Sequence, residues 1–261
     1  MERVKRSYLK EVRELLRDKK KRDLARLFVV EGSKIARDII DKGYLPVSII
    51  ISDSYLKKDR SFAEYAEKKG VNSFHVSDRD FSRACTLKNP EGVFLVMSKP
   101  TSGTDLSNVS GKGPVLLLDN VQDPGNLGTM VRIAAAFGAD EVLLYGDCAD
   151  EFNPKTIRAS AGAVVSTPVS RVDLDRIDNL KNRGIKLFAG TSASDAKSTL
   201  LEIANEKTFG VFAFGSEGRG FSEEILERAD RVFHIPIENE VESLNVAAAA
   251  AITLYEIRKG S

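Results

Sequence analysis

Cysteine and histidine are scarce in this 261-residue sequence, which has only two of each. Cys85 and Cys148 lie far apart and neither belongs to a CxxC motif, so the pattern predicts neither a disulfide framework nor a zinc site. His75 and His234 have no acidic or cysteine partner at metal-ligand spacing, and we interpret both as ordinary strand residues. The sequence therefore predicts a protein of the cytosol whose function needs no metal.

Long apolar segments are also missing. No run approaches the roughly 18 residues that a membrane-spanning helix needs, and the start of the chain lacks the apolar region of a signal peptide. The longest apolar run, Val246 to Ile252, is mostly alanine and predicts a closely packed helix. We expect a cytoplasmic protein without a membrane partner. Hydrophobic residues make up 42% of the chain, enough to bury a core, and the length favours two domains.

The net charge is only +1, but positive charge is concentrated at the start of the chain. Residues 1–34 contain 12 Lys and Arg against 6 Asp and Glu, so the rest of the chain is net negative. A basic segment of this kind could neutralise RNA phosphates. It could equally be a solvated helix face, and composition leaves both interpretations open.

Helix and strand patterns alternate along the first hundred residues. We expect helices over 7–21, 33–42 and 61–70, and strands over 27–32, 46–52, 72–77 and 91–98. This alternation predicts an α/β domain over residues 1–99. Residues 100–113 are rich in Gly, Ser and Thr without apolar periodicity, which is typical of a linker.

The same alternation continues from residue 114 to residue 261. We expect strands over 114–121, 141–146, 185–190, 209–215 and 231–237, and helices over 126–137 and 243–259. The run over 114–121 is almost continuously apolar, as in a central parallel strand covered on both faces. The sequence thus predicts a second α/β domain with a mostly parallel sheet, whose sites gather where the strands end.

The loop after the first of these strands leads into a helix through Asp123, Pro124 and Gly125. Asn126 could cap that helix. Arg132 lies about two turns further among apolar residues, where an unpaired buried charge would be costly. We therefore expect Arg132 to have an anionic partner or to face a cleft, with a functional role favoured over a structural ion pair.

Two further loops follow buried strands. Residues 214–221 place three glycines around Ser216, Glu217 and Arg219, so a ligand could lie against bare backbone, and Glu217 could pair with Arg132. The spacing fits neither a phosphate-binding loop nor a dinucleotide-binding motif. In the third loop Pro236 ends a strand and Ser243 precedes an alanine-lined helix, which by itself is explained as a helix cap.

Together the three loops resemble the signature motifs of the SpoU (TrmH-like) family of the SPOUT methyltransferase superfamily. The matching positions, in chain order, are Asn126-x-Gly128-x-x-x-Arg132, Gly215-Ser216-Glu217-Gly218-x-Gly220, and Ile235-Pro236 followed by Ser243-Leu244-Asn245-Val246. Lys19 to Asp23 and Phe28 to Gly32 are similar to the opening of that family's substrate-binding domain. Asn239 departs from the pattern, since family members often have glycine there.

This resemblance implies an N-terminal domain similar to small RNA-binding ribosomal proteins and a catalytic domain with a trefoil knot. It implies that S-adenosylmethionine is the cofactor and that the chain forms a homodimer through its alanine-rich last helix. The implied cofactor-binding residues are Thr191, Gly215, Gly220, Ile235 and Leu244. The implied catalytic residues are Asn126, Arg132, Glu217, Ser243 and Asn245, and we expect Arg132, Glu217 and Asn245 to converge around the methyl donor.

The reaction implied is methylation of a ribose 2′-hydroxyl in ribosomal RNA, most consistent with the large subunit. Guanidinium groups stay protonated at neutral pH, so we expect Arg132 to stabilise a developing oxyanion and hold a phosphate, with Glu217 orienting it. A tRNA ribose methyltransferase is the alternative within the same chemistry. A non-catalytic RNA-binding or ribosome-assembly protein is the alternative from another class, and a nucleotide-binding oxidoreductase requires the glycine loop to be misread.

Overall fold

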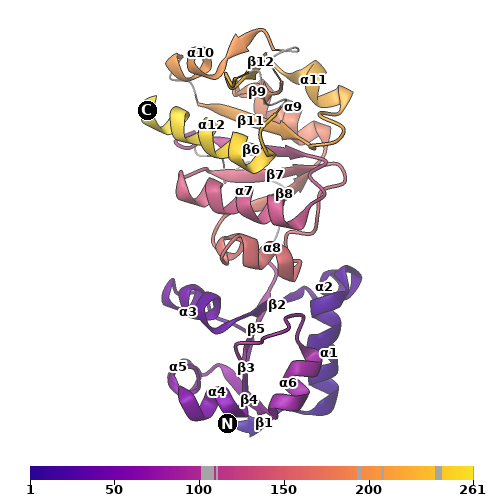
Figure 1. The fold of residues 1–261 in the computed structure, drawn as a ribbon, viewed down its shortest axis with the longest axis vertical. Helices are drawn as coiled ribbons and strands as arrows, with labels where there is room; N and C mark the ends of the chain where they lie inside the picture. Colours follow the sequence, from indigo (N-terminus) through magenta and orange to yellow (C-terminus); the bar gives the residue numbers. More distant parts are fainter. Residues whose placement is uncertain (101–108, 110, 193–195, 207–208, 239–242, 261) are drawn as a thin grey trace. The chain divides into compact units, whose positions relative to one another are not determined.

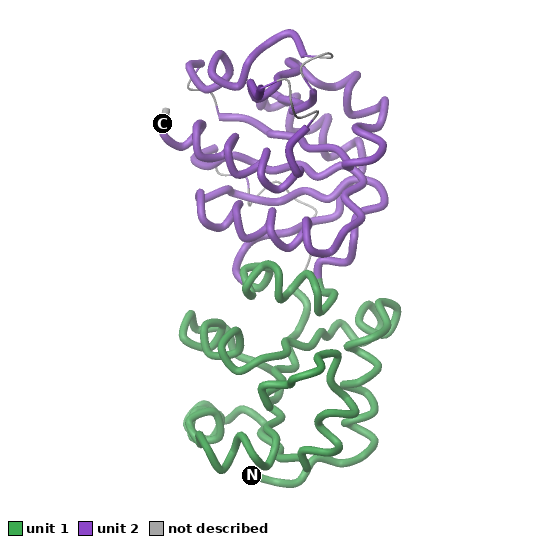
Figure 2. The backbone as a smooth tube through the Cα atoms, in the orientation of Figure 1, with its two compact units in different colours: residues 1–101, 152–165 green, residues 102–151, 166–261 purple. Residues whose placement is uncertain are grey.

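The computed structural model (Figure 1) describes residues 1–100, 109, 111–192, 196–206, 209–238 and 243–260. It forms two compact units (Figure 2): the first unit is Met1–Thr101 with Phe152–Val165, and the second is Ser102–Glu151 with Ser166–Ser261. Most of the predicted linker over 100–113, and Asn239, lie outside the described residues. Within the described ranges no helix is long and apolar enough to span a membrane.

The first unit contains a five-stranded sheet. Its strands, in spatial order, are β1 Glu2–Arg3, β4 Asn72–Val76, β3 Ser48–Ser52, β5 Val93–Ser98 and β2 Leu27–Glu31. β1, β4 and β3 run parallel, whereas β5 is antiparallel to both β3 and β2. Its helices are α1 Arg6–Arg17, α2 Lys19–Ala25, α3 Ser33–Asp41, α4 Asp53–Lys58, α5 Ser61–Lys69 and α6 Asp78–Ala84. Helices cover both faces of the sheet (Figure 1), which confirms the predicted α/β class.

Two short helices of this unit, α4 and α6, were not expected from the sequence. Each begins directly after a strand, at Ser52 and Ser77, whose hydroxyls accept hydrogen bonds from Tyr55 N and Asp80 N. Each has only six or seven residues, too few to show a helical period.

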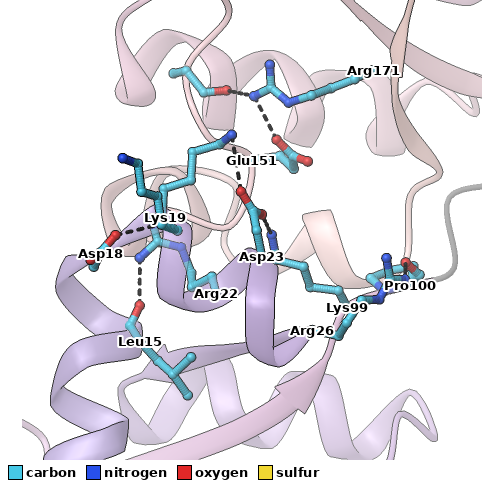
Figure 3. A network of polar contacts seen from close by, with 12 residues as sticks. Leu15, Asp18, Lys19, Arg22, Asp23, Arg26, Lys99, Pro100, Glu151 and Arg171 are labelled. Carbon is cyan, nitrogen blue, oxygen red and sulfur yellow. Dashed lines mark hydrogen bonds and ion pairs between the residues drawn. The ribbon is translucent and has the colours of Figure 1, made fainter.

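The single helix expected over 7–21 is broken in two at Asp18. Its extended backbone (φ −122°, ψ 117°) ends α1, and its carboxylate accepts from Lys20 N at 2.8 Å to cap α2. Arg22 is buried and donates to Leu15 O at 2.6 Å, which holds the bend between the two helices (Figure 3). Because of this break, the basic residues that the sequence placed on one helix belong to two separate helices.

Residues 152–165 belong to the first unit, although they separate two strands of the second. They form α8 Pro154–Ala159 and a 3₁₀ turn, Ala163–Val165. The ring of Phe152 packs on Phe28 with centroids 4.6 Å apart. The Glu31 carboxylate, only 3% exposed, accepts hydrogen bonds from Cys85 Sγ, Thr86 N and Oγ1, and Arg158 Nη1. This buried carboxylate therefore links the segment to β2.

Replacing Glu31 with Ala is expected to lower the free energy of unfolding by about 2 kcal/mol, because Thr86 N–H and the Arg158 guanidinium lose their buried, charged acceptor. Urea unfolding measures the change. Glu67→Ala on the exposed face of α5 is the control and should stay within about 0.5 kcal/mol of wild type. Equal stability of the two variants would contradict the role assigned to Glu31.

The second unit contains a seven-stranded sheet in which every pair is parallel. Its strands, in spatial order, are β10 Ser198–Thr199, β12 Arg231–His234, β9 Lys186–Gly190, β11 Gly210–Gly215, β6 Val115–Asp119, β7 Glu141–Tyr145 and β8 Val169–Val172. Its helices are α7 Pro124–Ala136, α9 Leu174–Asn182, α10 Leu200–Asn205, α11 Glu223–Arg228 and α12 Val246–Gly260. The parallel sheet and the central position of β6, buried on both faces, confirm the prediction.

Helices pack on both faces of this sheet. α7 and α12 lie side by side on one face (Figure 1). On the other face, Ile177 of α9 and Ile225 of α11 join a core cluster with Val115 and Leu117 of β6. The chain runs outward from β6 through β7 to β8, then crosses to β9 and β11 on the opposite side of β6. The loops after β6 and β11 therefore meet where the strand order reverses, the usual ligand position in such sheets.

Both cysteines are buried, and burial raises the pKa of the Cys85 thiol to about 12 and that of the Cys148 thiol to about 11. Because the thiolate is the reactive species, we expect neither thiol of the folded protein to react with Ellman's reagent at neutral pH. Both should react after unfolding in guanidinium chloride. Rapid reaction of the native protein would contradict this assignment.

Candidate functional site

The loop from β6 to α7 is held by side chains that accept hydrogen bonds from backbone N–H groups. Asn120 has a left-handed backbone (φ 55°), and its Oδ1 accepts from Asp147 N at 2.8 Å. Pro124 is the first residue of α7, and the helix is capped by Asp123, whose Oδ1 accepts from Asn126 N at 2.9 Å. Since Asp123 is the cap, the side chain of Asn126 is available for other contacts. The capping interpretation of Asn126 is therefore wrong.

The loop after β11 is closed by a two-bond bridge. Ser216 N donates to Gly220 O at 3.0 Å, and Gly220 N donates to Ser216 O at 2.9 Å. A Cβ on Gly215 would lie 2.6 Å from backbone atoms of Gly220, so this turn requires glycine at 215. Glu217 is presented at the exposed tip of the turn.

Asp119 joins these two loops. Its side chain lies at the end of β6, is fully buried, and accepts from Ser222 N at 2.6 Å and from Ser222 Oγ at 2.8 Å. Its other oxygen accepts from Asn120 Nδ2 at 2.7 Å. Asp119 thus holds the loop containing Glu217 against the start of the loop that leads to Asn126. Sequence reasoning missed this role, although an Asp-Asn pair ending an apolar strand was its visible signal.

The third loop ends at Asn245, which caps α12. Asn245 Oδ1 accepts from Ala247 N at 3.0 Å and Ala248 N at 3.3 Å. The helix expected from residue 243 therefore begins at Val246, and the cap is Asn245 rather than Ser243, which is exposed. Capping fixes the Asn245 amide with its nitrogen pointing away from the helix.

The three loops meet at that nitrogen. Asn245 Nδ2 donates to Glu217 Oε1 at 2.7 Å and to Asn126 Oδ1 at 3.1 Å, and Val246 N donates to Glu217 Oε1 at 3.5 Å. Residues separated by up to 119 positions in the chain thus form one hydrogen-bonded group. Of the residues expected to converge, the structure brings Glu217 and Asn245 together, with Asn126 as their third member.

A pocket of about 230 Å³ opens beside this group. Its lining comes from the loop after β6, the loop after β11 and the start of α12: Asn120, Val121, Gln122, Asp123, Asn126, Ser216, Glu217, Gly218, Arg219 and Val246. A Cβ on Gly218 or Gly220 would meet no atom within 4 Å, and Gly220 has φ +68°. Bare backbone therefore faces open space here, as a cradle for a ligand requires.

Arg132 does not join this group within the chain. It is exposed on α7 and makes no hydrogen bond or ion pair with any residue that the structure describes. It lies six positions after Asn126, which turns it about 240° around the helix, onto another face. The expected anionic partner or cleft is not found within the described part of one chain, and a solvated guanidinium needs none because it carries no desolvation cost. The expected contact with Glu217 does not occur within one chain.

The residues expected to bind the cofactor follow three neighbouring parallel strands. Thr191 comes after β9 and its N donates to Phe233 O at 2.9 Å, Gly215 ends β11, and Ile235 follows β12. These three positions share one edge of the sheet. Ile235 and Leu244 are half-buried and offer apolar surface. Within the described ranges, no group of three or more His, Cys, Asp and Glu residues is placed to hold a metal ion.

The model of the SpoU rRNA Methylase family matches residues 113–255, more than half of the chain. The chain belongs to this family. The model of the MRM3-like substrate binding domain matches residues 6–95. The resemblance to this family that the sequence indicated is therefore confirmed.

Full-length relatives share both regions. The chain is 33% identical over 244 residues, 93% of each chain, to a Bacillus subtilis protein named 23S rRNA (guanosine(2553)-2'-O)-methyltransferase RlmP. It resembles the AdoMet-bound rRNA methyltransferase from Sinorhizobium meliloti, with TM-score 0.83 and 26% identity, over 99% of this chain and 97% of that one. It also resembles a solved RNA 2'-O ribose methyltransferase, with TM-score 0.80 and 26% identity, over 100% and 99%. The predicted SPOUT fold and the family's RNA methyltransferase chemistry are thereby confirmed.

Proposed function

We propose that this SpoU protein transfers a methyl group from S-adenosylmethionine to the 2′-hydroxyl of a ribose in large-subunit ribosomal RNA. The observation that carries the proposal is the hydrogen-bonded group of Asn126, Glu217 and Asn245 beside a pocket at the reversal point of a parallel sheet. A relative that covers 93% of both chains and is named for 23S rRNA supports ribosomal RNA as the substrate.

S-adenosylmethionine supplies a methyl group activated by its bond to a positively charged sulfur. The residues that would hold it are Thr191, Gly215, Gly220, Ile235 and Leu244, which offer bare backbone and apolar surface along one strand edge. The segments 215–222 and 243–246, in contact through Glu217 and Asn245, would belong to the trefoil knot that the family implies.

The catalytic side is formed by polar groups of this chain. Asn245 fixes Glu217 and Asn126 so that their remaining polar atoms face the pocket, which positions the ribose. Ser243, exposed just before Asn245, contributes to the same side. The guanidinium of Arg132 would stabilise negative charge on the 2′-oxygen while the hydroxyl proton passes to solvent water, and would hold a neighbouring phosphate.

A homodimer would bring Arg132 into an enclosed site. The outer face of α7 and α12 carries Arg132 with exposed apolar residues: Ile252 is 39% exposed and Tyr255, in edge contact with Phe137, is 53% exposed. Ala135, Ala136 and Ala248 are exposed on the same two helices, and their small side chains allow close approach of a second copy. Burial of Arg132 in this interface requires an anionic partner, which Glu217 of the partner subunit or an RNA phosphate would provide.

Light scattering after size exclusion should give twice the 28.6 kDa mass of one chain. Ile252→Glu should give the single-chain mass, because a charge in the apolar contact must be desolvated. Leu226→Glu, an equally exposed position on α11 at the opposite face of the sheet, is the matched control and should remain dimeric. A single-chain mass for wild type would contradict the dimer.

Mapping of 2′-O-methyl groups on ribosomal RNA, with and without the protein, tests the proposed function. We expect one large-subunit nucleotide to gain the modification. Modification of tRNA alone would identify a tRNA ribose methyltransferase. Uptake of S-adenosylmethionine without modification of any RNA would contradict the proposal.

A further inference from the structure

A basic groove lies in the first unit, outside the site described above. It has a volume of about 680 Å³ and lies where β1, α1 and α6 come together. Its lining residues are Arg3, Val4, Arg6, Leu9, Lys10, Arg13, Val76, Asp80, Arg83 and Ala84. Five of these side chains are cationic and one is a carboxylate. The groove therefore combines a concave shape with a strongly positive charge.

One wall of the groove is a single face of α1. Arg6, Lys10 and Arg13 are four and three residues apart, which places them on one stripe of the helix. The stripe spans about 10 Å along the axis. Val12 and Leu15 are buried on the opposite side and fix the helix on the sheet, so the orientation of the stripe is set by the core.

Three of the five cations of the groove are not neutralised by the residues that the structure describes, whereas Arg83 lies 3.9 Å from Asp80. Arg3, Arg6 and Arg13 are exposed and make no ion pair with any residue in the described part of the chain. Lys10 has only a long contact of 3.9 Å with Glu14, whose own side chain lies outside the lining. Like charges in a concave site raise the local positive potential and attract polyanions.

The basic residues of α2 differ from those of the groove. Lys19 pairs with Asp23 at 3.4 Å, which also accepts from Lys99 (Figure 3), and Lys21 pairs with Glu14 at 3.5 Å. The break at Asp18 thus separates Lys19 and Lys21, which are paired with carboxylates, from the groove, where only Lys10 and Arg83 have long 3.9 Å ion pairs among the described residues.

The chemistry of the lining selects phosphate. It includes no aromatic ring on which a base could stack, and no Asn or Gln that could pair with a base edge. Guanidinium groups bind phosphate oxygens in a fork geometry. We propose that this groove binds the phosphate backbone of the RNA substrate without reading its sequence, an inference that rests on the proposed function.

The salt dependence of RNA binding tests this inference. The variant Arg6→Gln/Lys10→Gln/Arg13→Gln is titrated with transcribed large-subunit rRNA over a range of salt concentrations. The slope of log K against log salt should fall by about 2, since each lost phosphate contact contributes about 0.7 for a single strand. Binding at low salt should weaken at least tenfold, equally for native rRNA and a scrambled RNA of the same length.

The matched control is Lys58→Gln/Lys68→Gln/Lys69→Gln, which removes three exposed cations from α4 and α5. It should keep the wild-type slope. An unchanged slope in the groove variant, or a loss confined to the native sequence, would overturn the proposal. Binding of S-adenosylmethionine and the melting temperature should match wild type in both variants, so failure of the groove is distinguishable from failure of the methyltransferase.

Discussion

Arg132→Lys should lower kcat roughly 100- to 1,000-fold while leaving the affinity for S-adenosylmethionine nearly unchanged. Lysine keeps the positive charge but loses the planar fork that contacts an oxyanion and a phosphate together. Arg132 is exposed and far around α7 from Asn126, so the substitution leaves the pocket beside Asn245 intact. Single-turnover methyl transfer to saturating rRNA measures the rate, and calorimetry measures cofactor binding.

Arg60→Lys is the matched control, because Arg60 is an exposed arginine of the first unit with no assigned role. It should retain wild-type turnover. Retained turnover in Arg132→Lys would remove Arg132 from the catalytic residues. A parallel loss of cofactor affinity would show that Arg132 acts on binding rather than on the methyl transfer.

Gly215→Ala should weaken binding of S-adenosylmethionine about 10- to 100-fold. The added Cβ would lie 2.6 Å from the carbonyl carbon and oxygen of Gly220, and neither backbone atom can yield without opening the bridge between Ser216 and Gly220. Overpacking of this kind costs about 1–3 kcal/mol, and each 1.4 kcal/mol is about a factor of ten in affinity. Equilibrium binding of the methyl donor measures the loss.

Gly218→Ala provides the control within the same loop. A Cβ there meets no atom within 4 Å, and the residue is not in the left-handed region. Its cofactor affinity should stay within a few-fold of wild type. Equal affinities of the two alanine variants would show that the closed turn at Gly215 does not shape the cofactor site.

The parallel sheet of the second unit was predictable because its strands are local and strongly patterned. The run from Val115 to Leu118 is buried on both faces, as its unbroken apolar sequence indicated. The short elements α8 and β8 were not predicted. Residues 152–165 pack through contacts such as the one between Glu31 and Arg158. These two residues lie 127 positions apart, so no local sequence pattern predicts their contact.

The site residues could be found by motif, but their contacts could not. Asn126, Glu217 and Asn245 meet because parallel strands bring their loops to one edge. The apolar neighbours of Arg132 suggested burial, yet they line the other faces of α7 and leave Arg132 in solvent. His75, interpreted as an ordinary strand residue, contacts Asp53 at 2.8 Å, a partner 22 positions away that sequence spacing does not reveal.

The central claim is that Thr191, Gly215, Gly220, Ile235 and Leu244 form a methyl-donor site next to the hydrogen-bonded group of Asn126, Glu217 and Asn245. Calorimetric titration of S-adenosylmethionine into the purified full-length protein tests it most directly. We predict saturable binding with one cofactor per chain, weakened by Gly215→Ala and kept by Arg132→Lys. A folded wild-type protein that takes up no S-adenosylmethionine would contradict the claim.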